Sequence, residues 1–180
     1  EWTDLQNVIE NSGALKKISG GYSWNGGAAS VQVIPENQDG NLAFYANGID
    51  TYSVIGLSGS NTNSDWTTIE YGINLRDDGS FMIRESGGPN ELQTSPLYQS
   101  GDVFEIKREG NVLSYWHNGT FLRSLSNVSK ALIVDISMPA EGHVMNRMKI
   151  NTSGKVLLAH NEYNELGELI EKNLHQEQSA

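Results

Sequence analysis

The sequence predicts an all-β fold, an antiparallel β-sandwich. Three observations predict this fold class. Short segments alternate apolar and polar residues, Gly, Ser and Asn interrupt them about every 8 to 12 positions, and no internal segment has a convincing helical period. Because side chains alternate across a strand, each sheet is expected to bury one face and to leave the other exposed to solvent.

Eight segments fit the alternating pattern of a strand. They are residues 42–45, 53–57, 69–75, 81–84, 103–108, 112–117, 131–136 and 148–150. Glu109-Gly110-Asn111 joins the fifth and sixth segments as a tight turn and predicts a hairpin. In its second strand, Leu113 and Tyr115 share the core face, which leaves Trp116 on the polar face.

Within residues 69–75 the same alternation assigns two faces. The side chains expected on the core face are Ile69, Tyr71, Ile73 and Leu75, and those expected on the wet face are Glu70, Gly72, Asn74 and Arg76.

The composition changes near residue 151, which predicts a sandwich over residues 1–150 and a linker or appendage over 151–180. Residues 155–160 are expected to form one more strand. Residues 161–180 carry five Glu and one Lys. Their apolar side chains have the spacing of a helical stripe, although Gly167 interrupts it; these side chains are Leu166, Leu169, Ile170 and Leu174.

Composition excludes several function classes. The 180 residues contain 12 Lys and Arg against 22 Asp and Glu, a net charge of −10. This acidity argues against nucleic acid as a partner, because nucleic-acid binding depends on cationic side chains that neutralise phosphates. The lack of an apolar run of about 18 residues argues against membrane insertion. The lack of Cys excludes disulfides, thiolate zinc sites and cysteine nucleophiles.

Two parts of the chain resemble known families. Residues 163–169, YNELGEL, resemble the Tyr-Asp-x-x-Gly-x-Leu unit of YD-repeat (RHS-type) proteins, which are large bacterial surface or secreted polypeptides; one copy is present, with Asn164 in place of Asp. Matches spread over residues 2–150 are similar to concanavalin-like or SPRY-like β-sandwich modules of such proteins. They include Trp2–Leu5, Trp24–Ser30, Gly56–Ser58, Ile69–Ile73, Gly101–Phe104 and Tyr115–Gly119.

The resemblance implies a jelly-roll, concanavalin-like sandwich that is non-catalytic and lectin-like. It further implies a secreted or cell-surface bacterial protein, in which the sandwich precedes a YD-repeat region that would be its partner. The matched Gly101-Asp102 and Asn118-Gly119 pairs are also turn signals, and Gly26-Gly27 is expected to permit backbone dihedrals that a side chain forbids.

The candidate binding residues point to a glycan or polysaccharide ligand. Aromatic rings can stack on the apolar face of a sugar, and Asn and Asp side chains can fix its hydroxyl groups. Trp116, on the polar face of its strand, and Trp66, after a polar loop, are the best candidates, with Tyr98 and His117 behind them. Trp2 and Trp24 are expected in the core, where large aromatics usually pack.

Catalysis is not expected. Glycoside cleavage needs two carboxylates that flank the scissile bond, and no Glu-x-Asp-x-x-Glu pattern occurs. No cofactor is predicted. Structural calcium stays open, because Glu36–Asn41 and Asp77-Asp78-Gly79 supply oxygen ligands. Two alternatives to sugar binding also stay open: a structural or interaction domain that packs against YD-repeats, and a polysaccharide lyase or hydrolase.

Overall fold

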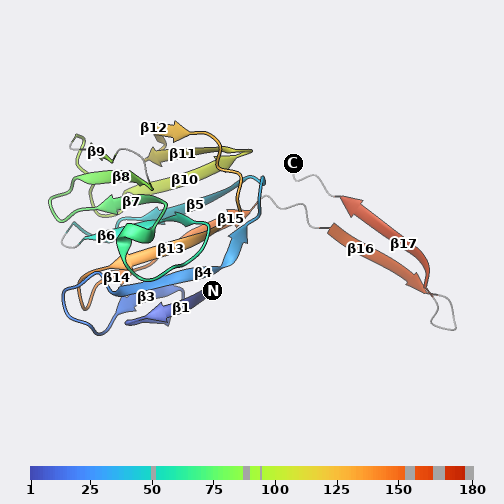
Figure 1. Ribbon diagram of the computed structural model, residues 1–180, viewed down its shortest axis with the longest axis horizontal. Helices are drawn as coiled ribbons and strands as arrows, with labels where there is room; N and C mark the ends of the chain where they lie inside the picture. Colours follow the sequence, from blue (N-terminus) through green and yellow to red (C-terminus); the bar gives the residue numbers. More distant parts are fainter. Residues whose placement is uncertain (50–51, 87–89, 94, 153–156, 164–168, 177–180) are drawn as a thin grey trace.

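The computed structural model confirms an all-β antiparallel sandwich (Figure 1). It describes residues 1–49, 52–86, 90–93, 95–152, 157–163 and 169–176, with side chains up to residue 152. Within these ranges the only helix is a single 3₁₀ turn, η1 (Trp66–Thr68), so no described helix is long and apolar enough to cross a bilayer.

A seven-stranded antiparallel sheet forms one layer. Its spatial order is β1-β4-β13-β6-β7-β8-β9. The strands are β1 (Trp2–Gln6), β4 (Gly26–Ile34), β13 (Leu132–Met138), β6 (Ser53–Ser58), β7 (Tyr71–Leu75), β8 (Phe81–Glu85) and β9 (Glu91–Gln93).

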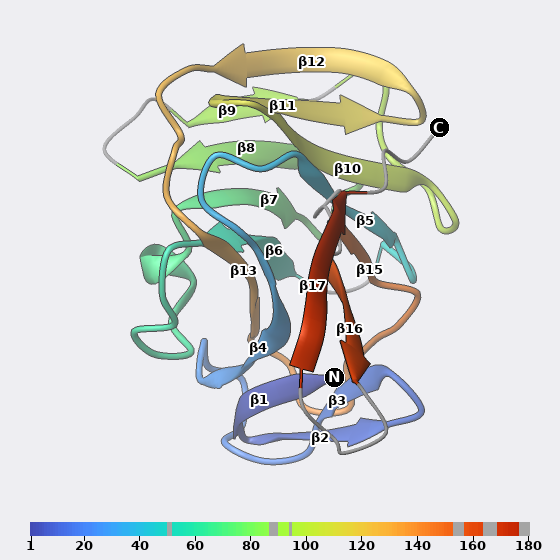
Figure 2. The ribbon, with the colours of Figure 1, turned by 90° about the vertical axis from the view of Figure 1, so that its right-hand side faces the viewer.

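A five-stranded antiparallel sheet forms the other layer, in the order β12-β11-β10-β5-β15. Its strands are β12 (Thr120–Leu125), β11 (Val112–His117), β10 (Val103–Glu109), β5 (Gly40–Tyr45) and β15 (Lys149–Thr152). Figure 2 shows the two layers side by side, with β10, β5 and β15 to the right of β8, β7 and β6. A small sheet closes one end with β2 (Val8–Asn11), β3 (Ala14–Lys17) and β14 (Val144–Met145).

The hydrophobic core lies between the two main sheets. Phe81 of β8 meets Phe104 of β10 across the layers, with ring centroids 5.0 Å apart. The inward residues alternate along each strand, as in Phe104 and Ile106 of β10, which are fully buried. Arg123 of β12 also joins the layers through Glu85 of β8, at 3.1 Å. The alternation therefore determines which face of each strand builds the core.

The outer face of the seven-stranded sheet is covered at its centre by the segment 59–69. Small residues make this possible. A side chain at Gly27 would lie 2.9 Å from Ser64 Cβ, and one at Gly72 would lie 3.1 Å from Ile69 Cγ2. Ser137 Oγ donates a hydrogen bond to the Ser64 carbonyl at 2.6 Å and fastens the segment. As a result, all six residues of β6 are buried.

Buried cations hold loops at the two ends of β13. Lys17 is fully buried, and its Nζ donates hydrogen bonds to the carbonyls of Gly21, Ser23 and Pro139 at 2.6 to 2.9 Å.

Arg108 is also fully buried and donates to the carbonyls of Gln38, Lys130 and Pro35. Burial lowers the pKa of both groups, and these carbonyl bonds offset part of the desolvation cost.

All eight segments predicted within the sandwich contain a strand, and the predicted hairpin is β10–β11. The predicted wet face of residues 69–75 is wrong for Gly72 and Asn74, which are buried. Gly26 and Gly27 have ordinary strand dihedrals. Glycine is needed here for close packing and not for its dihedrals, because a Cβ atom at Gly27 would also lie 2.6 Å from the Ile136 carbonyl oxygen.

In the C-terminal part, the strand expected over residues 155–160 is present, but the described residues do not form the expected helical stripe. The predicted domain boundary at residue 150 falls inside β15, which pairs with β5 through Thr152. Beyond it, β16 (Leu157–Tyr163) and β17 (Leu169–Gln176) pair antiparallel as a two-stranded sheet of their own. The predicted helical stripe is wrong for Leu169, Ile170 and Leu174, which lie in β17; Leu166 and Gly167 lie outside the described residues. The extended pairing of the hairpin overrides a stripe that is weak on its own.

Candidate functional site

The four predicted binding residues lie in three different places. Trp116 lies on the outer face of the five-stranded sheet, and Trp66 lies over the outer face of the seven-stranded sheet, on the opposite side of the sandwich. Tyr98 and His117 are buried. The fold therefore does not bring these four side chains into one site.

Trp116 is half-buried on its outer face, as the alternation predicts, while Leu113 and Tyr115 of the same strand are fully buried. Its indole N–H donates a hydrogen bond to Ser114 Oγ at 2.9 Å. Phe121 of β12, which is 51% exposed, packs edge-on against it with ring centroids 5.3 Å apart. These contacts fix the plane of the indole on a solvent-exposed face.

A shallow hollow of about 500 Å³ lies beside Trp116 on the same face. Strand pairing puts outward residues of three strands in one row: Lys107 of β10 faces Asn41 of β5, and Asn41 faces Asn151 of β15. Asn151 Nδ2 donates a hydrogen bond to Asn41 Oδ1 at 2.9 Å. The walls of the hollow thus present amide and charged groups within one open surface.

Lys107 links the hollow to the indole. Its Nζ lies 4.7 Å from the centroid of the Trp116 ring and 3.2 Å from Glu105 Oε2. A cation over an indole face is attracted to the ring quadrupole. The ammonium, carboxylate and amides together offer donors and acceptors next to an aromatic ring, an arrangement that suits polyhydroxylated ligands.

Trp66 is held inside a cluster of side chains. Asp65 caps η1 by accepting a hydrogen bond from the Thr67 N–H, which starts the turn that positions the ring. The guanidinium of Arg84 lies 3.9 Å from the centroid of the indole, and Arg84 Nη1 donates to the Trp66 carbonyl at 3.3 Å. Arg84 is only 9% exposed, and burial lowers its pKa. One face of Trp66 is therefore occupied by the protein itself.

Trp24 joins this cluster, which corrects its predicted place in the core. Its ring lies 5.8 Å from Trp66 and 6.4 Å from Tyr52. All three rings are half-buried. We call Trp24, Tyr52, Trp66 and Arg84 the aromatic cluster. Trp2, by contrast, packs against the core as predicted.

Tyr98 and His117 are placed where they cannot serve as ligand contacts. Tyr98 is 1% exposed, packs against Phe104, and its hydroxyl donates to the Arg76 carbonyl at 2.7 Å. His117 is 6% exposed and stacks on Phe104 at 4.6 Å. Both predictions are wrong because the side chains point into the core, as alternation from Trp116 already requires for His117.

His117 is partnered by a half-buried carboxylate at the edge of the core. Its Nε2 lies 2.8 Å from Asp102 Oδ2. Burial raises the pKa of Asp102, but hydrogen bonds from Asn118, the Gln99 N–H and His117 outweigh it and hold the pKa below its usual value. The pair thus fastens the turn before β10 to the end of β11.

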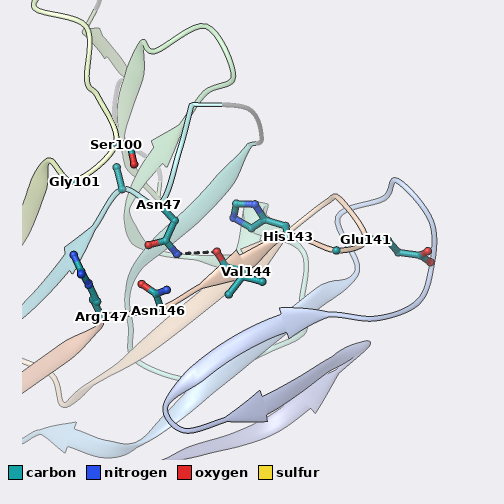
Figure 3. Close-up of a pocket in the computed structure, with 10 residues that line it drawn as sticks. Asn47, Ser100, Gly101, Glu141, His143, Val144, Asn146 and Arg147 are labelled. Carbon is teal, nitrogen blue, oxygen red and sulfur yellow. Dashed lines mark hydrogen bonds between the residues drawn. The ribbon is translucent and has the colours of Figure 1, made fainter.

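A polar cleft, which sequence reasoning missed, opens at one end of the sandwich (Figure 3). It has a volume of about 710 Å³. Three segments of the chain line it, through Asn47, Ser100, His143, Asn146 and Arg147 among others. Asn47 Nδ2 donates a hydrogen bond to the Val144 carbonyl at 2.8 Å, which ties two of these segments together. Each segment carries turn residues, but only the topology shows that they converge.

In the loops proposed for structural calcium, carboxylates accept hydrogen bonds from the protein itself. Asp39 Oδ1 accepts a hydrogen bond from the Gly110 N–H at 2.7 Å, and Asp78 Oδ1 accepts from the N–H and hydroxyl of Ser80. In the part of the chain that the structure describes, no three His, Asp or Glu side chains gather as metal ligands.

No protein-family model matches the chain, and no curated protein sequence matches it significantly. Solved structures do share its fold. The SPRY domain of human HERC1 is 17% identical, with a TM-score of 0.56 over 82% of this chain and 93% of that domain. A sialidase is 12% identical, with a TM-score of 0.54 over 87% of this chain but only 18% of its own length. An alginate lyase of polysaccharide lyase family 7 is 10% identical, with a TM-score of 0.50 over 84% of each chain.

These comparisons establish the fold alone. The chain has the SPRY-like, concanavalin-like β-sandwich that its sequence predicts. Because SPRY domains and enzymes both carry this fold, function must be argued from the surfaces of the sandwich.

Proposed function

We propose that the sandwich is a non-catalytic carbohydrate-binding module that holds a glycan on the outer face of the five-stranded sheet. The observation that carries the proposal is the half-buried Trp116 ring beside the hollow lined by Asn41, Lys107 and Asn151. The comparisons are compatible with a binding module and leave the choice of ligand to these residues.

The chemistry of a sugar matches this surface in two ways. The C–H groups on one side of a pyranose ring are apolar and can pack on the indole of Trp116, while the hydroxyl groups project from the edge. Lys107 and the Asn41–Asn151 amides lie where they can exchange hydrogen bonds with those hydroxyls. Because Ser114 and Phe121 already fix the indole, binding costs little side-chain entropy.

The wider setting belongs to the same proposal. The module would be part of a secreted or cell-surface bacterial protein and would precede a YD-repeat region, which residues 163–169 resemble. Strand β15, whose Asn151 and Thr152 line the hollow, is the last strand of the sandwich before this segment in the sequence.

The test compares two tryptophans on opposite faces. We expect Trp116→Ala to abolish retardation in affinity gels that contain a panel of neutral and acidic polysaccharides, because the stacking platform is lost. Trp66→Ala is the matched control and should keep the wild-type retardation. Loss of binding in the control alone would move the site to the aromatic cluster and contradict the proposal.

Two results would favour the remaining alternatives. A folded wild-type protein that no polysaccharide retards, but that a separately expressed YD-repeat segment retains, would favour a structural domain that packs against those repeats. Release of reducing or unsaturated sugar ends from any member of the panel would favour a polysaccharide hydrolase or lyase.

A further inference from the structure

Arg147, in the polar cleft of Figure 3, has an unusual backbone conformation. Its φ angle is +54°. The other described non-glycine residues with positive φ are all Asn, Asp or Ser, namely Asp4, Asn7, Ser12, Asn37, Asn118 and Asn127. Short polar side chains tolerate this region, whereas a long side chain strains it. A stability argument alone would place Asn or Gly at position 147, so the guanidinium itself requires an explanation.

The cleft has the charge of an anion site. The guanidinium of Arg147 lies 5.4 Å from the centroid of the Tyr45 ring, and it forms no ion pair with any residue that the structure describes. The only carboxylate that lines the cleft, Glu141, points away from Arg147 (Figure 3). Glu141 Oε1 instead accepts a hydrogen bond from the Gly21 N–H at 2.6 Å. In a chain with a net charge of −10, an unpaired guanidinium facing a cleft is well placed to bind an anion.

The rest of the cleft offers groups for hydroxyls. Asn47, Ser100 and Asn146 contribute amides and a hydroxyl to its walls. Asn146 Oδ1 is buried and has no hydrogen-bond partner among the described residues, although a buried acceptor normally has one. Because this oxygen is itself inaccessible to solvent, the Asn146 side chain must turn toward the cleft for a ligand hydroxyl to reach it. Apolar side chains contribute little to these walls, which favours a polyhydroxylated ligand over a peptide.

We propose that this cleft is a second binding site that takes the carboxylate of an acidic sugar, with Arg147 as the anion contact and Asn47 and Asn146 as hydroxyl contacts. The proposal rests on the proposed function only in that the ligand is a sugar. The residues involved are separate from Trp116 and its hollow.

The test is an NMR titration of the ¹⁵N-labelled protein with glucuronate, glucose and acetate at equal concentrations. We expect glucuronate to shift the resonances of Asn47, Asn146 and Arg147, and glucose to shift them at least tenfold less. The shifts should weaken as salt rises, because the contact is ionic. Equal shifts with acetate would overturn the assignment to a sugar, because the site would then bind any carboxylate, and no shift at these residues with glucuronate would overturn the proposal outright.

Two variants separate binding from folding. Arg147→Gly should abolish the glucuronate shifts while the thermal midpoint stays equal or rises, because glycine relieves the left-handed backbone. Lys130→Gln is the charge-matched control beyond the opposite end of β13 and should leave the shifts unchanged. Glucuronate shifts that persist in Arg147→Gly would contradict the role of the guanidinium.

The two sites can fail independently. Trp116→Ala should leave the glucuronate shifts in the cleft intact. If Trp116→Ala loses polysaccharide retardation but glucuronate leaves the cleft unshifted, only the second site is wrong. If the cleft responds and no polysaccharide is retarded in a Trp116-dependent way, the site on the five-stranded sheet is wrong.

Discussion

The two outer faces of this sandwich both belong to antiparallel sheets, but a segment of the chain covers one of them and the other is exposed to solvent. On the seven-stranded sheet, Gly27, Gly56 and Gly72 leave room for the segment 59–69, and both faces of β6 become buried. On the five-stranded sheet, the corresponding outward positions carry Lys107, Ser114 and Trp116, which stay partly exposed. The size of the outward residues therefore decides whether a sheet face becomes a second core or stays exposed to solvent.

This difference also explains why two similar tryptophans behave differently. Trp66 belongs to the covering layer and is held by Arg84 and Trp24. Trp116 stands on an uncovered strand and contacts Phe121 and Lys107, both of which reach solvent. We expect substitutions on the covered face to change mainly stability and those on the open face to change mainly binding.

The largest expected effect is at Gly56. A Cβ atom there would meet the Tyr71 carbonyl and lie 2.7 Å from Gly72 Cα, so backbone atoms would have to move. Gly56→Ala should therefore lower the free energy of unfolding by at least about 3 kcal/mol. Ala43→Val on the open face adds two methyl groups and should change it by less than about 0.5 kcal/mol. Urea unfolding measures both, and equal losses would contradict the contrast between the faces.

The next effect is the pH dependence caused by Asp135 beneath the covering segment. Burial raises the pKa of Asp135 from 3.8 to about 6, although Ser58 Oγ donates a hydrogen bond to it at 2.9 Å. The folded state then holds a proton that the unfolded state releases between these values, so stability falls as pH rises from about 4 to 6. The loss is up to about 3 kcal/mol.

Asp135→Asn should remove this slope, since an amide does not titrate. The measurement is urea unfolding of both proteins at pH 4 and pH 7, and Glu109→Gln, an exposed carboxylate on β10, is the control that should keep the wild-type slope. An unchanged slope in Asp135→Asn would show that this carboxylate is not desolvated in the folded state.

The contrast between the faces also shows what sequence reasoning can reach. Alternation placed Ile106, Tyr115 and Trp116 correctly, because each strand of the five-stranded sheet has one wet face. The rule fails for Gly72, because Ile69 of the segment that directly precedes this strand packs against it, and for Asn74, which is also buried on the outer face. Strand β4, which begins Gly-Gly-Ala-Ala-Ser, was missed because these residues have low strand propensity and are selected for close packing.

The candidate sites were only partly predictable for a similar reason. Trp116 follows from its own strand, so the sequence suffices to find it. The cleft around Arg147 needs three parts of the chain that are far apart in sequence, residues 46–47, 100–101 and 141–147, and the turn residues of each one have an adequate local explanation. Trp24 was assigned to the core because its exposure depends on the position of Trp66, which local patterns do not contain.

An intermediate effect is expected in the aromatic cluster. Trp66→Ala removes the contacts with Arg84 and Trp24 and should cost about 2 kcal/mol of stability, without weakening polysaccharide binding. Trp24→Ala should be destabilising too. In a double-mutant cycle measured by urea unfolding, the pair should be coupled by about 1 kcal/mol, because each ring packs on the other. Strictly additive losses would contradict a shared cluster.

The smallest stability effect is expected at Phe121, on the open face. This side chain is 51% exposed on the edge strand β12, so Phe121→Ala should cost less than about 1 kcal/mol. Its ring nevertheless holds the plane of Trp116, with an angle of 73° between the two rings. Losing an edge-to-face contact of about 0.5 to 1.5 kcal/mol should weaken polysaccharide binding roughly 2- to 12-fold, because the indole is no longer fixed before the sugar arrives. Leu92→Ala, on the edge strand of the other sheet and similarly exposed, is the control that should alter neither quantity appreciably. If Phe121→Ala destabilised the protein as much as Trp66→Ala, the open face would be a packed layer as well, and the distinction between the two faces would disappear.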